Sequence, residues 1–171
     1  MTDASGPIVL VEGDSDRIAV EMLAARLGVD LPPVVAIGGS KNARRAIAAH
    51  PGARLIGLVD AGERRDFESV IDPVFVCDPD LEAEFVRALG VDGTLAVVRE
   101  QGELDSFRTL QRQPALRERS IEVQLARFFG GRSGNKLRYA RLLAEAVPLD
   151  RVPPPLAALF AAVASAGRDD V

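Results

Sequence analysis

The 171-residue sequence has very little of what several common active sites require. It contains one cysteine, Cys77, one histidine, His50, and no tryptophan. A single cysteine excludes a disulfide within the chain, and a single histidine argues against a histidine-based triad or a zinc site. Cys77 follows the apolar run Val74-Phe75-Val76, which indicates a buried structural thiol.

Long hydrophobic runs are also missing. No apolar stretch approaches the roughly 18–20 residues that a membrane span needs. The first seven residues have neither the basic nor the apolar region of a signal peptide. With 47% hydrophobic residues and a mean hydropathy of +0.09, the composition is that of a folded protein. We expect a cytoplasmic location, with which the single cysteine agrees.

The first half of the chain alternates short apolar runs with helical patterns. Strands are predicted over 8–11, 34–37, 55–59 and 74–76, and helices over 15–27, 43–49 and 81–89. Residues 61–73 are polar and are predicted to form a loop. Alternation with short connections is typical of a parallel α/β sheet.

From residue 91 onward there is no further strand candidate. Helices are predicted over 92–100, 103–112, 120–129, 135–146 and 155–165, separated by glycine and proline. We therefore divide the chain into an α/β domain over 1–90 and a helical C-terminal extension over 91–171, packed on it.

Acidic residues stand directly after two predicted strands. Glu12 follows Ile8-Val9-Leu10-Val11, and Asp60 follows Leu55-Ile56-Gly57-Leu58-Val59. Because the carboxyl ends of parallel strands share one edge of a sheet, we expect these carboxylates to converge. Asp16 and the run Asp78-Pro79-Asp80-Leu81-Glu82-Ala83-Glu84 supply further acids, although Asp80 also suits a helix cap. Converging carboxylates without histidine or cysteine favour a hard cation such as Mg²⁺, and hence phosphoryl chemistry.

The net charge of −4 is unevenly distributed. Nine basic and two acidic residues lie between Arg108 and Arg141, so this segment carries +7 and the remainder −11. Such a segment can neutralise nucleic-acid phosphates, and the alternative is a solvated helical surface. We interpret it as a nucleic-acid surface beside an acidic metal pocket.

Four motifs together resemble the toprim domain, an α/β module of topoisomerases, bacterial-type primases and overcoming-lysogenization-defect (OLD) nucleases. They are Val11-Glu12-Gly13-Asp14-Ser15-Asp16, Gly38-Gly39-Ser40-Lys41-Asn42, Gly57-Leu58-Val59-Asp60 and Asp80-Leu81-Glu82. Their order and spacing are most similar to the OLD version. The resemblance covers about residues 8–90, and more loosely the helices up to about Arg141. It implies a toprim-like Rossmannoid parallel sheet flanked by helices, with an all-helical C-terminal extension.

The resemblance also implies residue roles. Glu12 matches the toprim glutamate, a metal ligand or general base, and Asp60 the first aspartate of Asp-x-Asp. Lys136 takes the place of a late lysine that stabilises transition-state charge, so the implied catalytic residues are Glu12, Asp60 and Lys136. The implied ligands of Mg²⁺ or Mn²⁺ are Glu12, Asp16, Asp60, Glu63, Asp80 and Glu82. The predicted nucleic-acid contacts are Lys41, Arg132, Lys136, Arg138 and Arg141.

One motif departs from the family pattern. Asp-x-Asp here reads Asp60-Ala61-Gly62, so the second carboxylate is missing. Glu63 can substitute because Gly62 leaves the backbone pliable. The alternative for Glu63 is an exposed charge beside two arginines.

The glycine-rich segment over 38–42 lies between a predicted strand and a predicted helix. This geometry can hold a phosphate, although the spacing of a P-loop is absent. OLD nucleases usually carry an ATPase domain ahead of the toprim part, and only seven residues precede the first strand here. We therefore expect any ATPase to be a separate protein.

The function predicted is a Mg²⁺-dependent phosphodiester hydrolase acting on nucleic acid, DNA rather than RNA. The alternative is a non-catalytic, degenerate toprim module that binds metal, nucleic acid or a separate ATPase. A phosphorelay receiver domain is disfavoured because the only late lysine lies among helices. A homodimer is a candidate assembly, and no membrane partner is expected.

Overall fold

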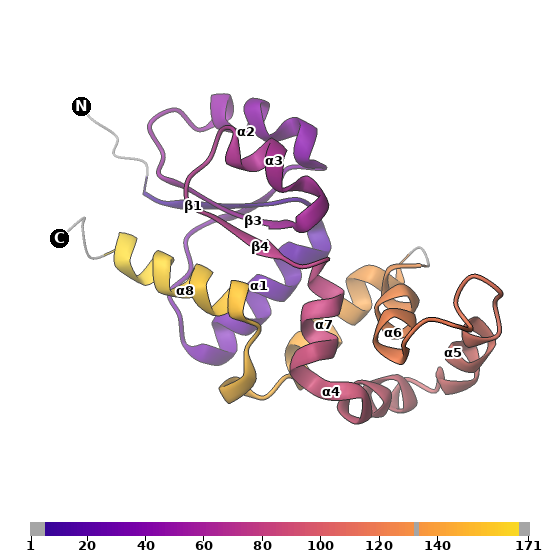
Figure 1. The fold of residues 1–171 in the computed structure, drawn as a ribbon. Coiled ribbons are helices and arrows are strands. Elements are labelled where there is room, and N and C mark those ends of the chain that lie inside the picture. Colours follow the sequence, from indigo (N-terminus) through magenta and orange to yellow (C-terminus); the bar gives the residue numbers. More distant parts are fainter. Residues whose placement is uncertain (1–5, 132–133, 168–171) are drawn as a thin grey trace.

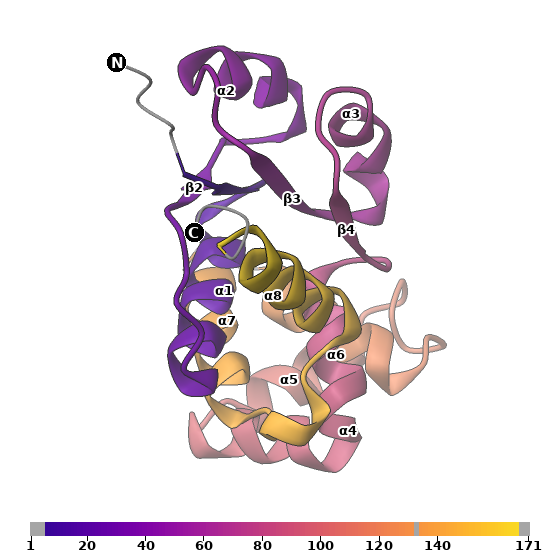
Figure 2. The ribbon, with the colours of Figure 1, turned by 90° about the vertical axis from the view of Figure 1, so that its left-hand side faces the viewer.

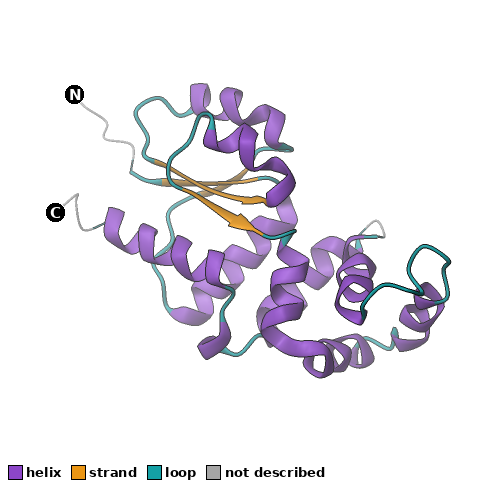
Figure 3. Ribbon diagram, viewed as in Figure 1, coloured by secondary structure: helices purple, strands orange, loops and turns teal. Residues whose placement is uncertain are grey.

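A computed structural model describes residues 6–131 and 134–167. Its centre is a four-stranded, all-parallel sheet in the order β2-β1-β3-β4 (Figure 3). The strands are β1 (Ile8–Val11), β2 (Val34–Ala36), β3 (Leu55–Asp60) and β4 (Val74–Cys77). Each of the four predicted strands is present, within one residue at either end.

Helices surround this sheet (Figure 1). The α-helices are α1 (Asp14–Leu27), α2 (Ala43–Ala49), α3 (Arg64–Glu68), α4 (Leu81–Glu100), α5 (Leu104–Gln111), α6 (Ile121–Gly130), α7 (Asn135–Ala146) and α8 (Pro154–Ala166). Single 3₁₀ turns are η1 (Ser40–Asn42), η2 (Ala61–Glu63) and η3 (Leu149–Arg151). Within the described residues no strand follows β4, as predicted, and no helix is both long and apolar enough to cross a bilayer.

The sheet is buried on both faces, which explains the continuous apolar runs of its central strands. Helices α2 and α3 lie over one face, and α1 and α8 over the other (Figures 1 and 2). Alternate residues of β1 point to opposite faces: Ile8 and Leu10 pack under α2 and α3, whereas Val9 and Val11 join the larger cluster. The edge strand β2 is only half-buried.

The prediction that residues 61–73 form a loop was wrong. This segment contains η2 and α3, and Phe67 of α3 is fully buried against the sheet with Ile71 four residues later. Space for the Phe67 ring exists because β3 carries Gly57: a Cβ there would stand 3.2 Å from Phe67 Cδ1. The i, i+4 pair of apolar residues was the helical signal hidden among the charges.

Helix α4 is kinked at Gly90, between the two helices predicted over 81–89 and 92–100. Gly90 has φ 74° and ψ 167°, a conformation available essentially to glycine alone. The first half of α4 begins beside the sheet, and the second half leads toward α5 and α6 (Figure 1).

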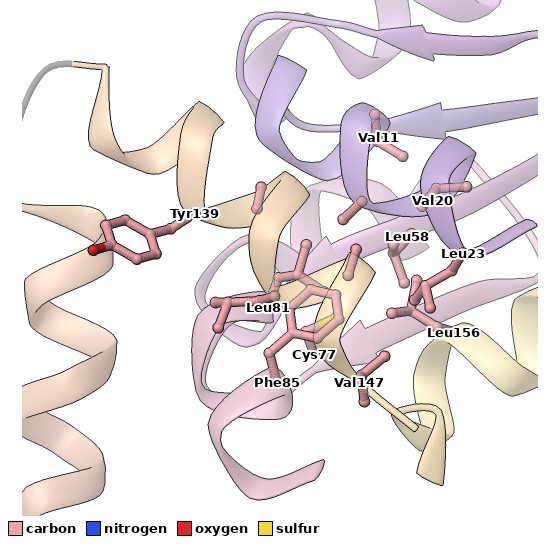
Figure 4. Packing of buried hydrophobic residues seen from close by; sticks show 14 of the residues in the cluster. Val11, Val20, Leu23, Leu58, Cys77, Leu81, Phe85, Tyr139, Val147 and Leu156 are labelled. Carbon is pink, nitrogen blue, oxygen red and sulfur yellow. The ribbon is translucent and has the colours of Figure 1, made fainter. Parts of the chain in front are cut away.

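The C-terminal helices share a core with the sheet. Helix α7 packs along α1, and α8 packs against β3 and β4. Figure 4 shows side chains of one buried cluster coming from the sheet, α1, α4, α7 and α8, including Val11, Leu58 and Leu156. The division into domains at residues 90 and 91 stays a prediction. An aromatic group extends this core into the helices: the rings of Phe107, Phe128, Phe129 and Tyr139 are all buried and stack edge-on or tilted.

Phe67→Ala is expected to lower the free energy of unfolding by about 3–5 kcal/mol, because it removes a fully buried ring and leaves a cavity over Gly57. Urea denaturation followed by circular dichroism measures the loss. Leu149→Ala, at a side chain that is 44% exposed, is the control and should change stability by about 0.5 kcal/mol or less. Equal effects of the two substitutions would contradict the packing of α3.

Candidate active site

Strand order locates the region where chemistry is expected. The chain proceeds from β1 to β2 on one side and later places β3 on the other side of β1, so the order reverses between β1 and β3. In open parallel sheets, ligands bind outside the carboxyl ends of the strands at such a switch point. Glu12 directly follows β1 and Asp60 ends β3, so both border this position.

Asp16 and Glu12 belong to the turn that joins β1 to α1. The Gly13 amide donates a hydrogen bond of 2.9 Å to Asp16 Oδ2, which satisfies the N-cap amide at the start of α1. Asp16 is buried, while Glu12 is half-buried. This hydrogen bond fixes one carboxylate oxygen of Asp16 in place.

Asp60 is held by the start of α4. Its Oδ1 accepts a hydrogen bond of 3.1 Å from the Leu81 amide, and the Ala61 amide donates to the Pro79 carbonyl at 3.1 Å. These bonds tie the end of β3 to the loop before α4. The positive end of a helix dipole therefore faces the Asp60 carboxylate.

The acids of the Asp78–Glu84 run point to different tasks. Asp80 Oδ1 accepts from the Ala83 amide at 2.8 Å and caps α4, as the alternative interpretation allowed. Glu84 accepts from the Asp78 amide at 3.0 Å and is a structural acid. Glu82, buried on the first turn of α4, is instead paired with Lys136. The sequence alone could not distinguish these roles, because they depend on which side of α4 each acid occupies.

Lys136 reaches the acids from the second half of the chain. It lies at the start of α7, and its Nζ stands 3.6 Å from Glu82 Oε1. Burial lowers the pKa of Lys136, but the combined charges of Glu82, Asp16, Asp60 and Glu12 raise it above its ordinary value. Lys136 is therefore a permanent cation facing all four carboxylates.

The four carboxylates are electrostatically coupled. The pKa of Asp60 is raised to about 8, chiefly by burial and further by the charges of Asp16 and Glu82, whereas Lys136 lowers it. Burial likewise raises the pKa of Asp16 and of Glu82. The pKa of Glu12 is raised by burial and by Glu63 and Glu82, against Lys136. Buried carboxylates that repel one another bind a proton or a cation more readily than isolated ones.

This donor set suits a hard divalent cation, because every candidate ligand is a carboxylate oxygen. Glu12, Asp16, Asp60 and Glu82 are the side chains that would hold it. In the described part of the chain, however, no three acidic, histidine or cysteine side chains form a ready-made cage for an ion. The carboxylates lie at the same edge of the sheet and interact through their charges, and Lys136 places a positive charge near them.

Glu63 stands at the margin of this group. The Ser40 hydroxyl, which is buried, contacts a Glu63 carboxylate oxygen and lies 3.0 Å from Asp66 Oδ2. Glu63 nevertheless raises the pKa of Glu12. It therefore adds negative charge near Glu12, while one of its oxygens contacts Ser40, and its role as a substitute for the missing aspartate stays a prediction. Sequence reasoning did not identify Ser40 as the residue that orients it.

The glycine-rich loop uses two of its amides within the chain, and its role in holding a phosphate stays a prediction. The amides of Gly38 and Gly39 donate to the Glu12 carbonyl at 3.0 and 3.1 Å, so they brace the turn after β1. The helix that follows, α2, has only seven residues. Lys41 is exposed on η1.

Two of the arginines predicted to contact nucleic acid make internal ion pairs. Arg138 pairs with Glu103 and its guanidinium carbon lies 4.9 Å from the centre of the Tyr139 ring. Arg141 pairs with Glu145 at 2.9 Å on the exposed side of α7. Arg132 lies outside the described residues. The nucleic-acid roles of these side chains stay predictions.

A cleft of about 440 Å³ opens beside the acids, between the start of α4 and the exposed face of α6. Asp60, Glu82 and Lys136 line it from the site, and Val123 and Arg127 line it from α6. The sequence analysis missed the two α6 residues. Helical periodicity could have found them, because they lie opposite the buried Leu125, Phe128 and Phe129.

No family model matches the sequence, and no curated protein is significantly similar to it. Solved structures do match. The C-terminal region of the Burkholderia pseudomallei OLD protein superposes with a TM-score of 0.67 at 18% identity, over 95% of this chain and 98% of that one. The C-terminal region of the Xanthomonas campestris pv. campestris OLD protein, in a mercury-phased structure, gives 0.68 at 22% identity, over 99% of this chain and 100% of that one. The chain therefore has the toprim-like fold of the OLD C-terminal region, and the resemblance predicted from the four motifs is confirmed for the fold.

Asp60→Asn is expected to flatten the pH dependence of stability. With a native pKa of about 8 against an ordinary value of 3.8, Asp60 binds more protons in the folded state between these pH values. The protonated Asp60 carboxyl therefore contributes to the stability of the folded state at low pH. This contribution is lost as the pH rises from about 3.8 through 8. Asparagine keeps the acceptor for the Leu81 amide but carries no charge, so the variant should exceed the parent by about 1–2 kcal/mol at pH 9 in chelator.

Urea unfolding at pH 5, 7 and 9 measures this difference. Asp92→Asn, at an exposed position of α4 outside the cleft, is the matched control and should follow the parent. Parallel curves for Asp60→Asn and the parent would show that Asp60 is ionised throughout.

Proposed function

We propose that this chain is a metal-dependent phosphodiester hydrolase that acts on nucleic acid. The observation that carries the proposal is the group formed by Glu12, Asp60 and Glu82 at the switch point of the sheet, with Lys136 facing them from α7. The likeness of the fold to the C-terminal region of OLD proteins supports it.

Each residue has a task in such a reaction. A divalent cation, Mg²⁺ or Mn²⁺, would polarise the phosphate and activate water when bound. Asp60 and Glu82 hold the negative charge that attracts the cation, and Asp16 adds to it. Glu12, half-buried and with a raised pKa, can take a proton from the attacking water. The Lys136 ammonium remains charged and can stabilise negative charge on the phosphate.

A second candidate is a non-catalytic module that binds metal and nucleic acid. It is favoured by the sequence Asp60-Ala61-Gly62, which lacks the second aspartate, and by the contact of Glu63 with Ser40. A cation held by fewer carboxylates binds more weakly. The hydrolase and the binding module differ in whether the bound nucleic acid is cleaved.

The partners that follow from this proposal are a nucleic acid, DNA rather than RNA, and a separate ATPase. A homodimer and a cytoplasmic location remain part of the same proposal. The likeness to OLD proteins supports the nucleic acid and the ATPase, because it links this fold to that family.

Divalent metal should raise the melting temperature of the parent protein. Mg²⁺, Mn²⁺ or Ca²⁺ at millimolar concentration relieves the repulsion among the carboxylates and binds only the folded state. Asp60→Asn should abolish the shift, whereas Asp92→Asn should keep it. Differential scanning fluorimetry at pH 8 in a metal titration provides the measurement. A parent melting curve that ignores all three metals would refute the metal site.

Lys136→Ala should separate the two candidate functions. If Lys136 faces charge that develops during cleavage, the nicking rate of a plasmid should fall by about 100-fold or more, with little change in DNA affinity. Lys136→Arg should retain part of the rate, and Arg99→Ala, at an exposed arginine of α4 outside the cleft, should retain all of it. DNA affinity is measured by fluorescence anisotropy in Ca²⁺. A parent protein that binds DNA but shows no metal-dependent nicking would leave the binding module as the function.

A further inference from the structure

The exposed face of α6 forms one wall of the cleft beside the acids, and the mechanism above does not use it. Glu122, Val123, Ala126 and Arg127 line this wall, whereas the opposite face of α6 packs in the aromatic core. The other wall comes from the loop before α4 and its first turns, where Pro79 and Ala83 lie among charged residues. Each wall therefore offers both apolar and charged groups to a ligand.

Val123 and Arg127 are exposed on α6 and can contact a ligand. Val123 is 47% exposed, although α6 buries Leu125, Phe128 and Phe129. Arg127 is exposed and has no hydrogen bond or ion pair to any part of the chain that the structure describes. The other arginine of the cleft, Arg87, is by contrast bound to the Asp78 carbonyl and to Glu84. Arg127 is thus a cation available to a ligand, one helical turn from an exposed apolar side chain.

These groups match the parts of one nucleotide. Arg127 can bind a phosphate by two parallel hydrogen bonds, and the apolar walls can cover a sugar and a base. The scissile phosphate would lie toward Asp60, Glu82 and Lys136, at the charged side of the same cleft.

The volume of the cleft favours an unpaired nucleotide over a DNA duplex. At about 440 Å³ it has the volume of a small-molecule site, for which the usual range is about 300–1,000 Å³. This volume is too small to enclose a duplex, whose major groove alone is about 12 Å wide. One nucleotide that has left the base stack can do so.

We propose that this cleft binds one unpaired nucleotide next to the scissile phosphate, with Arg127 on its phosphate and Val123 against its base. The preferred substrate is then a single strand, or a duplex end or junction with an unpaired nucleotide. This inference rests on the proposed function for the position of the scissile phosphate, and the binding experiment below tests it without cleavage.

The experiment measures the affinity of three oligonucleotides by fluorescence anisotropy in Ca²⁺. They are a thymidine 12-mer, the same strand with abasic sites throughout, and a blunt duplex of equal length. The variants are Arg127→Ala and Val123→Ser, which change the α6 wall. Arg99→Ala and Leu149→Ser are the matched controls, since both side chains are exposed and lie outside the cleft lining.

The parent should bind the thymidine strand more tightly than the duplex. Arg127→Ala should weaken binding of the thymidine strand about tenfold, the loss of a charge-assisted contact to phosphate. Val123→Ser should weaken binding of the thymidine strand about threefold and leave binding of the abasic strand unchanged. Arg99→Ala and Leu149→Ser should have smaller effects on every oligonucleotide.

Two results would overturn the inference: a duplex bound as tightly as the single strand, or α6 variants that behave like their controls. A plasmid-nicking assay then separates the two proposals. Single-strand binding that depends on Arg127, without any metal-dependent cleavage, would remove the catalytic function and keep the nucleotide site. Cleavage that is insensitive to Arg127 and Val123 would keep the catalytic function and remove the nucleotide site.

Discussion

Four buried or half-buried carboxylates at one edge of the sheet repel one another, and the arrangement of the rest of the chain limits that repulsion. Leu81 of α4 donates its amide to Asp60, and Gly13 donates its amide to Asp16. Lys136 then brings a full positive charge to the group from α7. Even with these groups the pKa of Asp60 is about 8, so at neutral pH the folded chain protonates this acid or binds a cation beside it. The same tension makes the edge suited to holding a metal and a phosphate.

The helical second half of the chain is therefore part of the site and of the core. Helix α7 packs along α1, and this contact fixes the end from which Lys136 extends. Helix α8 covers β3 and β4, the strands that carry Asp60 and lead to Glu82. The segment that sequence composition marked only as basic thus contains the counterion of the acids and the wall formed by α6.

Much of this could be predicted from the sequence, because it depends on local patterns. Apolar runs located every strand, and an acid after β1 and another after β3 indicated the edge where they meet. Strand order could not be predicted, since it depends on contacts between distant segments. Helix α3 was missed because its one core residue, Phe67, lies among charges, and Ile71, which packs beside it, follows the end of the helix. The partners of Glu63 and Arg138 could not be predicted either, because Ser40 and Glu103 are distant in sequence and meet them only in the folded chain.

The kink at Gly90 lets the two halves of α4 run in different directions. The first half is tied to β3 by the bond from the Leu81 amide to Asp60, and the second half directs the chain toward α6. The chain turns between the two walls at a residue whose φ of 74° disfavours every side chain. A helix that continued straight through this point would carry α6, with its apolar and cationic groups, away from the acids. Glycine at position 90 therefore serves the shape of the cleft, although it takes no part in its chemistry.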